Sequence, residues 1–181
     1  LLPLLEGLSV VHAAGIVHRD LKPENVLLTH GENGLTTPRL VDFGIAQVER
    51  VGSSSKMTLD GTIIGTPAYM SPEQVQGKTV DARTDVWACA VLFYEMVTGR
   101  SPFDGDDLLS ILRAVSEGAP TYPRDVAGFD GKLWRILMAA LRKAPLERTV
   151  SVRALREELL AWQDLASAPR ATLTTPRNPE Q

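Results

Sequence analysis

The chain has 181 residues, of which 44% are hydrophobic, and this length suffices for a single soluble domain with a sizeable core. Its formal net charge of −3 provides no basic surface for a polyanion, so nucleic acid is excluded as an expected partner. The most apolar stretch, residues 86–97, contains Glu95 and is too short to cross a bilayer, so no membrane span is expected in this segment.

The only cysteine, Cys89, lies inside this apolar stretch, which favours a buried thiol and a reducing, cytoplasmic location. The chain begins at Leu1 without an initiator methionine or a signal peptide, and its first residues already have a helical pattern. We therefore expect a segment of a longer cytoplasmic protein, with any membrane anchor of that parent outside this segment.

The first half of the chain predicts one helix, one hairpin and one long loop. Apolar residues with helical spacing predict a helix of about four turns that ends at Gly15. Two β-rich runs, Val26–Leu28 and Arg39–Val41, predict a hairpin with a long polar loop. Residues 44–72 are rich in Ser, Gly and Thr, and an irregular loop of this length in a compact domain is usually functional.

The second half is predicted to be helical. Apolar periodicity, with a following Gly or Pro at three of the four segments, predicts helices over residues 81–98, 106–117, 130–143 and 151–165. After Leu165 the periodicity is lost and prolines become frequent, so residues 166–181 are expected to form a disordered linker. The folded domain is expected to span residues 1–165.

Three motifs carry chemistry, and they follow one another in the order of one known family. The first, HRDLKPEN, places Asp20, Lys22 and Asn25 in one tight loop, the second is Asp42-Phe43-Gly44 after the hairpin, and the third is GTPAYMSPE at residues 65–73. In these motifs the chain resembles the C-terminal lobe of a protein kinase, of the bacterial, eukaryotic-like serine/threonine type. The resemblance implies an α+β, mostly α fold: a helical C-terminal lobe with a small β-hairpin at the catalytic and metal loops.

The resemblance also implies a role for each polar residue of the loop. Asp20 would accept the proton of a substrate hydroxyl and Lys22 would neutralise the transferred phosphate of ATP. Asn25 and Asp42 offer the oxygen ligands that Mg²⁺, or Mn²⁺ in its place, prefers when it bridges nucleotide phosphates. Leu27, on the first strand, would contact the nucleotide. Without the family, Asp20 and Lys22 would be ordinary charged residues of a solvated loop.

Five further residues are expected to have structural roles in the resembling family. His18 packs beneath Phe43, although a histidine here also permits a metal or general-base role. Glu73 forms a buried ion pair with a distant arginine, which Arg148 matches, and Asp85 braces the backbone of the catalytic loop. The remaining histidines, His12 and His30, have no partner pattern and are expected to be structural or exposed.

Regulation is expected to involve the long polar loop. Arg19 precedes the catalytic acid, a position that in many kinases pairs with a phosphorylated loop, and an ordinary salt bridge is the alternative. Thr62 stands where the family usually carries its activating phosphate, with Thr58 as the second candidate, whereas Thr66 is expected to contact the substrate through its free hydroxyl. The alternative is that these hydroxyls are merely solvated.

A glycine-rich loop, a strand lysine for the nucleotide phosphates and its partner glutamate are all missing from the 181 residues. We therefore expect that the N-terminal kinase lobe is absent, that the parent protein phosphorylates Ser and Thr hydroxyls of protein substrates with ATP, and that this fragment alone is inactive. Two alternatives remain: a non-catalytic half-kinase or pseudokinase that binds through its exposed face, and a small-molecule phosphotransferase.

Overall fold

The computed structural model describes residues 1–30, 34, 36–42 and 67–167. Helix α1 (Leu2–Ala13) leads through a loop and a 3₁₀ turn into a hairpin of strands β1 (Val26–His30) and β2 (Thr36–Leu40), and the short helix α3 (Pro72–Val75) follows. The remaining helices are α4 (Arg83–Thr98), α5 (Leu108–Glu117), α6 (Gly131–Ala140) and α7 (Val152–Ser167). The predicted fold class, mostly helical with one small antiparallel hairpin, is confirmed for these residues.

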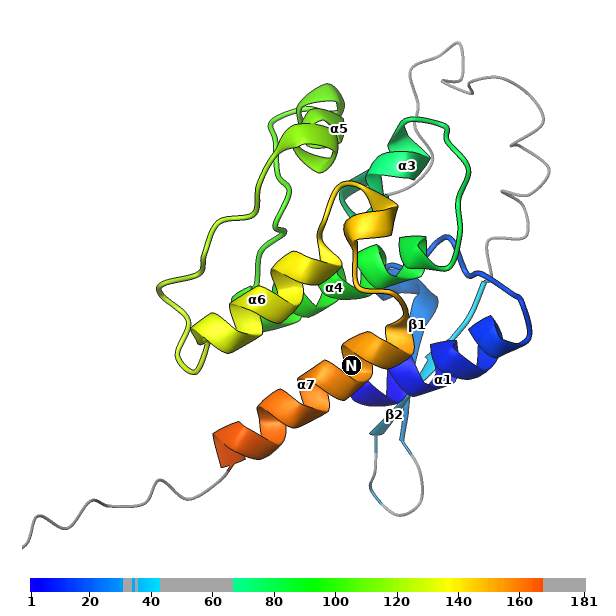
Figure 1. Ribbon diagram of the computed structural model, residues 1–181, viewed down its shortest axis with the longest axis vertical. Coiled ribbons are helices and arrows are strands. Elements are labelled where there is room, and N and C mark those ends of the chain that lie inside the picture. Colours follow the sequence, from blue (N-terminus) through cyan, green and yellow to red (C-terminus); the bar gives the residue numbers. More distant parts are fainter. Residues whose placement is uncertain (31–33, 35, 43–66, 168–181) are drawn as a thin grey trace, which may run out of the picture.

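Helix α4 is the centre of the fold. It runs behind α6 in Figure 1, with α7 below it in that view, and the hairpin lies beside α1. Ten of its residues are buried, and the Trp87 ring stacks on Phe103 at a centroid distance of 5.0 Å. The helix ends at Gly99, whose φ of 70° lies in the left-handed region that favours glycine. The sequence predicted this end from the same residue.

A lysine fixes the C-terminal end of α5 to this core. Lys143 Nζ donates to the carbonyl oxygen of Val115 over 2.6 Å. The same ammonium group lies 4.1 Å from the ring centroid of Phe103 and 4.8 Å from that of Trp87. A cation over aromatic rings and on a helix C-terminus is stabilised by the ring quadrupoles and by the helix dipole.

The predicted starts of α5 and α6 were two residues and one residue too early, for one physical reason. Asp107 accepts a hydrogen bond from the backbone N–H of Ser110 over 2.7 Å, and Asp130 accepts from Leu133 over 2.7 Å. These aspartates are N-caps outside the helices, because a carboxylate satisfies backbone donors that the first turn leaves unpaired. The sequence pattern had placed Asp130 and the aspartate before Asp107 inside the helices.

The hairpin is longer than predicted. Its strands extend to the pairs Thr29–Thr37 and His30–Thr36, residues that the sequence had assigned to the connecting loop. The Thr29 hydroxyl donates to the Thr37 carbonyl over 3.0 Å, so the added pairs carry side-chain support as well as the ladder. Threonine is a good strand residue despite its polarity. The short helix α3 was not predicted, and α7 continues to Ser167, two residues beyond its predicted end.

In the part of the chain that the structure describes, no helix combines the length and the apolar character needed to cross a bilayer.

Candidate active site

The HRDLKPEN loop connects α1 to β1 and has one unusual backbone position. Arg19 has a φ of 69°, a left-handed conformation that is uncommon for a residue other than glycine. Such a conformation persists only where its surroundings fix it. The contacts of the neighbouring peptide groups therefore show what holds the loop.

Asp85, in the first turn of α4, binds this loop through its backbone. Its Oδ2 accepts from the N–H of His18 over 2.8 Å and its Oδ1 accepts from the N–H of Arg19 over 2.9 Å. The Asp85 side chain is fully buried, so these bonds form away from solvent. The carboxylate thus fixes two successive peptide groups directly before Asp20.

His12 is a third partner of the same carboxylate, and the sequence did not indicate it. Its Nε2 lies 2.7 Å from Asp85 Oδ2, and the exposed fraction of its side chain is 11%. The only usable signal was its position near the end of α1, before the catalytic loop. It joins the end of α1 to the start of α4.

His18 is fully buried beneath the loop. Its Nε2 lies 3.2 Å from the carbonyl oxygen of Val41, and its Nδ1 lies 3.4 Å from the N–H of Asp20. A carbonyl only accepts and an N–H only donates, so the neutral tautomer with a proton on Nε2 satisfies both contacts. The expected packing partner, Phe43, lies outside the described residues.

Asp20, Lys22 and Asn25 meet at one carboxylate oxygen. Lys22 Nζ and Asn25 Nδ2 each donate to Asp20 Oδ2 over 3.0 Å, and Asn25 Nδ2 also lies 2.7 Å from the Asp20 carbonyl. The Asp20 side chain keeps 32% of its surface exposed and Lys22 keeps 19%. Within the described residues Oδ1 of Asp20 makes no hydrogen bond, so it is available to an incoming hydroxyl.

The two expected metal ligands are linked through the hairpin. The N–H of Val41, directly before Asp42, donates to the Asn25 carbonyl over 3.0 Å. Asp42 is exposed, with a left-handed φ of 53°. The amide nitrogen of Asn25 donates to Asp20, so the amide oxygen of Asn25 is available as a metal ligand.

The oxygens of Asn25 and Asp42 fit Mg²⁺ when nucleotide phosphates supply further ligands. Among the described residues no group of three or more His, Cys, Asp and Glu side chains is arranged to hold a metal by itself. Mg²⁺ commonly binds through one or two protein oxygens together with substrate phosphates, and Asn25 and Asp42 supply that number. Leu27, the expected nucleotide contact, keeps 52% of its surface exposed on β1.

Glu73 and Arg148 form a bidentate ion pair. The Arg148 guanidinium donates from NH1 to Oε1 over 2.7 Å and from NH2 to Oε2 over 2.9 Å. Both side chains are almost fully buried. Burial raises the pKa of Glu73, but the hydrogen bonds and the charge of Arg148 outweigh it, so that pKa lies below its ordinary value.

Arg148 also binds three backbone carbonyls, those of Arg83, Arg142 and Lys143. Its guanidinium carbon lies 5.2 Å from the centroid of the Trp87 ring. The arginine thereby ties α3, the start of α4 and the segment before α7 together, as a planar group with five donors allows.

Tyr69 is a further buried residue near the loop that the sequence did not indicate. Its hydroxyl donates to the Glu95 carboxylate on α4. Burial raises the pKa of Tyr69 well above its ordinary value, and the hydrogen bond to Glu95 and the charges of Glu95 and Glu24 raise it further. The phenol therefore stays neutral and donates its proton to the Glu95 carboxylate.

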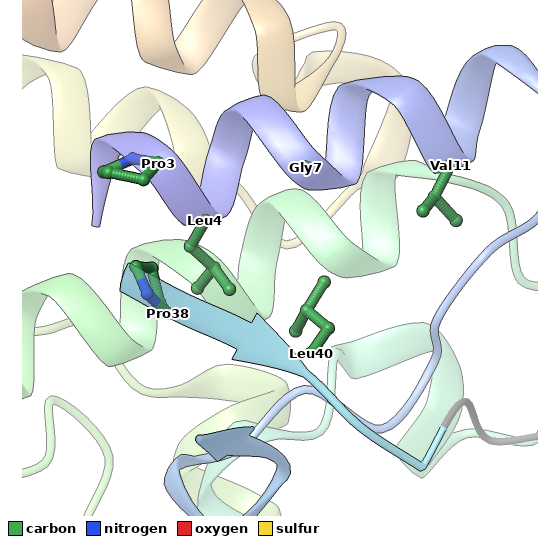
Figure 2. Close-up of a pocket in the computed structure, with 6 residues that line it drawn as sticks. All are labelled: Pro3, Leu4, Gly7, Val11, Pro38 and Leu40. Atoms are coloured by element: carbon green, nitrogen blue, oxygen red, sulfur yellow. The ribbon is translucent and has the colours of Figure 1, made fainter. Parts of the chain in front are cut away.

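A small cavity between α1 and β2 does not belong to this site. It is lined by Pro3, Leu4, Gly7, Val11, Pro38 and Leu40 (Figure 2). Its volume of about 150 Å³ is below the range of ligand pockets, and its lining offers no charged or polar side chain for a phosphate.

Three of the expected regulatory and substrate residues, Thr58, Thr62 and Thr66, lie outside the described residues. Arg19 is described, and its Nε is a buried atom without a hydrogen-bond partner among them. A buried guanidinium nitrogen without a hydrogen-bond acceptor lowers the stability of the fold, and a ligand that supplies the acceptor removes this cost.

Comparison with known sequences agrees with this geometry. A family model described as the protein kinase domain matches residues 1–155. The chain belongs to the protein kinase domain family.

Three bacterial proteins are among the relatives of this kinase chain. Serine/threonine-protein kinase PknL of Mycobacterium tuberculosis is 37% identical over 182 residues, which cover 99% of this chain and 43% of PknL. Serine/threonine-protein kinase pkn2 of Myxococcus xanthus is 39% identical over 184 residues, which cover 97% of this chain and 22% of pkn2. Probable serine/threonine-protein kinase PknB of Corynebacterium glutamicum is 35% identical, with 100% of this chain and 28% of the relative covered.

The family match and these similar proteins place the chain among the bacterial-type serine/threonine protein kinases. It spans less than half the length of each of these relatives.

Proposed function

We propose that this chain supplies the catalytic and metal-binding loops of an ATP-dependent kinase that phosphorylates Ser and Thr hydroxyls of proteins. The observation that carries the proposal is the joint contact of Lys22 and Asn25 with one oxygen of Asp20, which leaves the other oxygen available, on a loop fixed by Asp85.

The chemistry follows from the two oxygens of Asp20. Oδ2 is occupied by Lys22 and Asn25, which fixes the plane of the carboxylate. Oδ1 accepts the proton of the substrate hydroxyl as its oxygen bonds to the γ-phosphorus of ATP and the bond to the β-phosphate oxygen breaks. Lys22 is a compact cation beside this reaction and balances charge on the transferred phosphoryl group.

Mg²⁺ would be held by Asn25 and Asp42 together with the nucleotide, and when bound it neutralises the phosphate charges. The nucleotide itself needs a cover above β1. Leu27, with 52% of its surface exposed, offers an apolar face there, and Leu28, with 64% exposed, points to the opposite face of the strand. We propose that an N-terminal kinase lobe rests on the face of Leu27 and completes the ATP site, so that this chain alone has no phosphotransfer activity.

Regulation of the proposed kinase rests on Arg19. Its buried Nε, which has no hydrogen-bond partner among the residues that the structure describes, suits a phosphate group, which carries about −1.5 to −2 charges and three acceptor oxygens. We propose that the phosphate on Thr62, or on Thr58, accepts a hydrogen bond from the Arg19 guanidinium and thereby orders the loop. Thr66 is proposed to stay unmodified and to contact the protein substrate.

A chimera tests the proposed function without knowledge of further sequence. The whole chain replaces the segment of PknL that it matches, and γ-labelled ATP with Mg²⁺ and a protein substrate is supplied. Label on Ser or Thr of the protein, absent with the chain alone, is expected. A folded, nucleotide-binding chimera that transfers no label would favour a non-catalytic binding module, and label on small molecules alone would favour a different phosphotransferase.

A further inference from the structure

The amide side chain of Gln74 connects α3 to the catalytic loop. Its Nε2 donates to the carbonyl oxygen of Arg19 over 2.7 Å, across 55 residues of sequence. Its Oε1 accepts from the backbone N–H of Ser71 over 3.0 Å. A carbonyl cannot donate and an N–H cannot accept, so these two partners fix the orientation of the amide.

Arg19 is consequently held from both sides. Asp85 binds its N–H over 2.9 Å, and Gln74 binds its carbonyl. This is the residue with the left-handed φ of 69°, and its carbonyl belongs to the peptide group that ends at the nitrogen of Asp20. Gln74 therefore fixes the peptide plane from which the Asp20 side chain departs.

The Gln74 amide is linked to the buried Glu73–Arg148 ion pair through the residues Ser71 and Thr84. Thr84 donates its hydroxyl proton to Glu73 Oε1 over 2.9 Å, so it accepts from the Ser71 hydroxyl, 2.6 Å away. Ser71 in turn gives its N–H to Gln74. A continuous chain of hydrogen bonds thus runs from the Glu73–Arg148 pair to the carbonyl of Arg19.

Little space separates the two segments. The gap between the catalytic loop and the segment of Tyr69, Met70 and Gln74 has a volume of about 10 Å³. This is about the least that one water molecule needs. The contact of Gln74 with the Arg19 carbonyl is therefore direct, at 2.7 Å.

We propose that Gln74 is a positioning residue for Asp20, which couples the Ser71–Val75 segment to the catalytic loop through the carbonyl of Arg19. This inference rests on the proposed function, since it assigns Gln74 a part in the reaction of Asp20. Gln74 touches neither substrate nor nucleotide. Its effect on the rate passes through the Arg19 peptide.

The competing explanation is that Gln74 only caps α3. Ser71 and Gln74 form the N-cap and N3 positions of a capping box, a motif that stabilises helix starts by itself. Glutamate serves at N3 as well as glutamine, because its carboxylate accepts the same N–H. Gln74→Glu therefore keeps the acceptor of the cap and replaces the donor to Arg19 by a carboxylate oxygen, whereas Gln74→Met removes both the acceptor and the donor.

Two measurements separate the explanations. In the active chimera, Gln74→Glu and Gln74→Met are expected to lower kcat at least tenfold, with KM for ATP within twofold of the unchanged protein and the Tm of Gln74→Glu retained. Gln76→Glu, at an exposed glutamine at the end of the same helix, is the matched control and is expected to keep full activity. In the 181-residue chain itself, Gln74→Glu should speed amide hydrogen exchange at residues 19–21 at least tenfold.

Full kcat in Gln74→Glu would overturn the proposal and leave Gln74 as a cap. Unchanged amide exchange in Gln74→Glu would overturn it as well, whatever the activity. If the unchanged chimera transfers no phosphate, the proposed function fails, and the exchange measurement still decides whether Gln74 holds the loop.

Discussion

Asp85 and Glu73 are both buried carboxylates, with 0% and 4% of their surfaces exposed, but they bind different kinds of partner. Asp85 accepts two backbone N–H groups at the start of the catalytic loop and contacts a histidine at the end of α1. Glu73 accepts hydrogen bonds from both terminal guanidinium nitrogens of Arg148. Arg148 lies 75 residues away in the sequence and also binds three backbone carbonyls. One carboxylate shapes a loop, and the other joins separate helical segments. Loss of Asp85 should therefore act locally, and loss of Glu73 globally.

The largest effect is expected at the ion pair. Glu73→Ala and Arg148→Ala should each lower the free energy of unfolding by about 3–5 kcal/mol, because either change leaves a buried charge without its partner. The double variant should lose clearly less than the sum of the two. Urea unfolding of the four proteins measures this, and additive losses would show that the pair is not energetically coupled.

A smaller and more local effect is expected at Asp85. Asp85→Ala leaves the N–H groups of His18 and Arg19 without acceptors, at a cost of about 1–3 kcal/mol for a buried unsatisfied group. Amide exchange should rise in residues 18–25 much more than in α6 and α7. Equal increases throughout the chain would mean that Asp85, like Glu73, supports the whole fold.

The proposed phosphate switch gives an effect on activity alone. In the active chimera, Thr58→Ala together with Thr62→Ala should lower the rate several-fold and leave the free energy of unfolding unchanged, because the loop phosphate binds Arg19 and not the core. Mass spectrometry after incubation with Mg-ATP should find phosphate on Thr62 or Thr58. An unmodified loop in a fully active protein would assign the unpaired Arg19 nitrogen to another partner.

The smallest effect is a pH dependence at Lys143. Burial, and then the charge of Arg148, lower the pKa of Lys143 from 10.5 to about 8. Between these two values the unfolded chain binds more protons than the folded one, so the free energy of unfolding should rise as the pH increases from 8 to about 10. Because the site is half exposed, the rise is modest.

Lys143→Met should remove this rise, and Lys78→Met, at an exposed lysine, should keep it. Both variants lose one positive charge, so the difference between their pH profiles isolates the buried position. Parallel profiles for the two variants would show that Lys143 does not titrate in this range.

The features that depend on a local sequence pattern could be predicted from the sequence. Apolar periodicity and Gly99 located α4, and the alternation of β-rich runs with polar residues located the hairpin. The resemblance brought Asp85, Glu73 and Arg148 to notice by motif alone, and the structure places Glu73 against Arg148 and Asp85 against the loop backbone.

Other features depend on contacts between distant segments, and no local pattern encodes them. His12 shows no motif of its own, yet it meets Asp85 across 73 residues of sequence. Gln74 was not singled out in the sequence, and its contact with Arg19 appears only when α3 folds against the loop. Asp107 and Asp130 were assigned to the first turns of their helices, because charge at a helix start looks the same inside and outside the first turn.

The central claim is that Asp20 accepts the substrate proton on a loop that the fold holds in place. The direct test compares the active chimera with its Asp20→Asn variant under saturating Mg-ATP and protein substrate, with Asp81→Asn at an exposed aspartate as the control. The account predicts a loss of at least about a hundredfold in kcat for Asp20→Asn, with an unchanged Tm and an unaffected control. A rate near that of the unchanged chimera would contradict it and would show that another group accepts the proton.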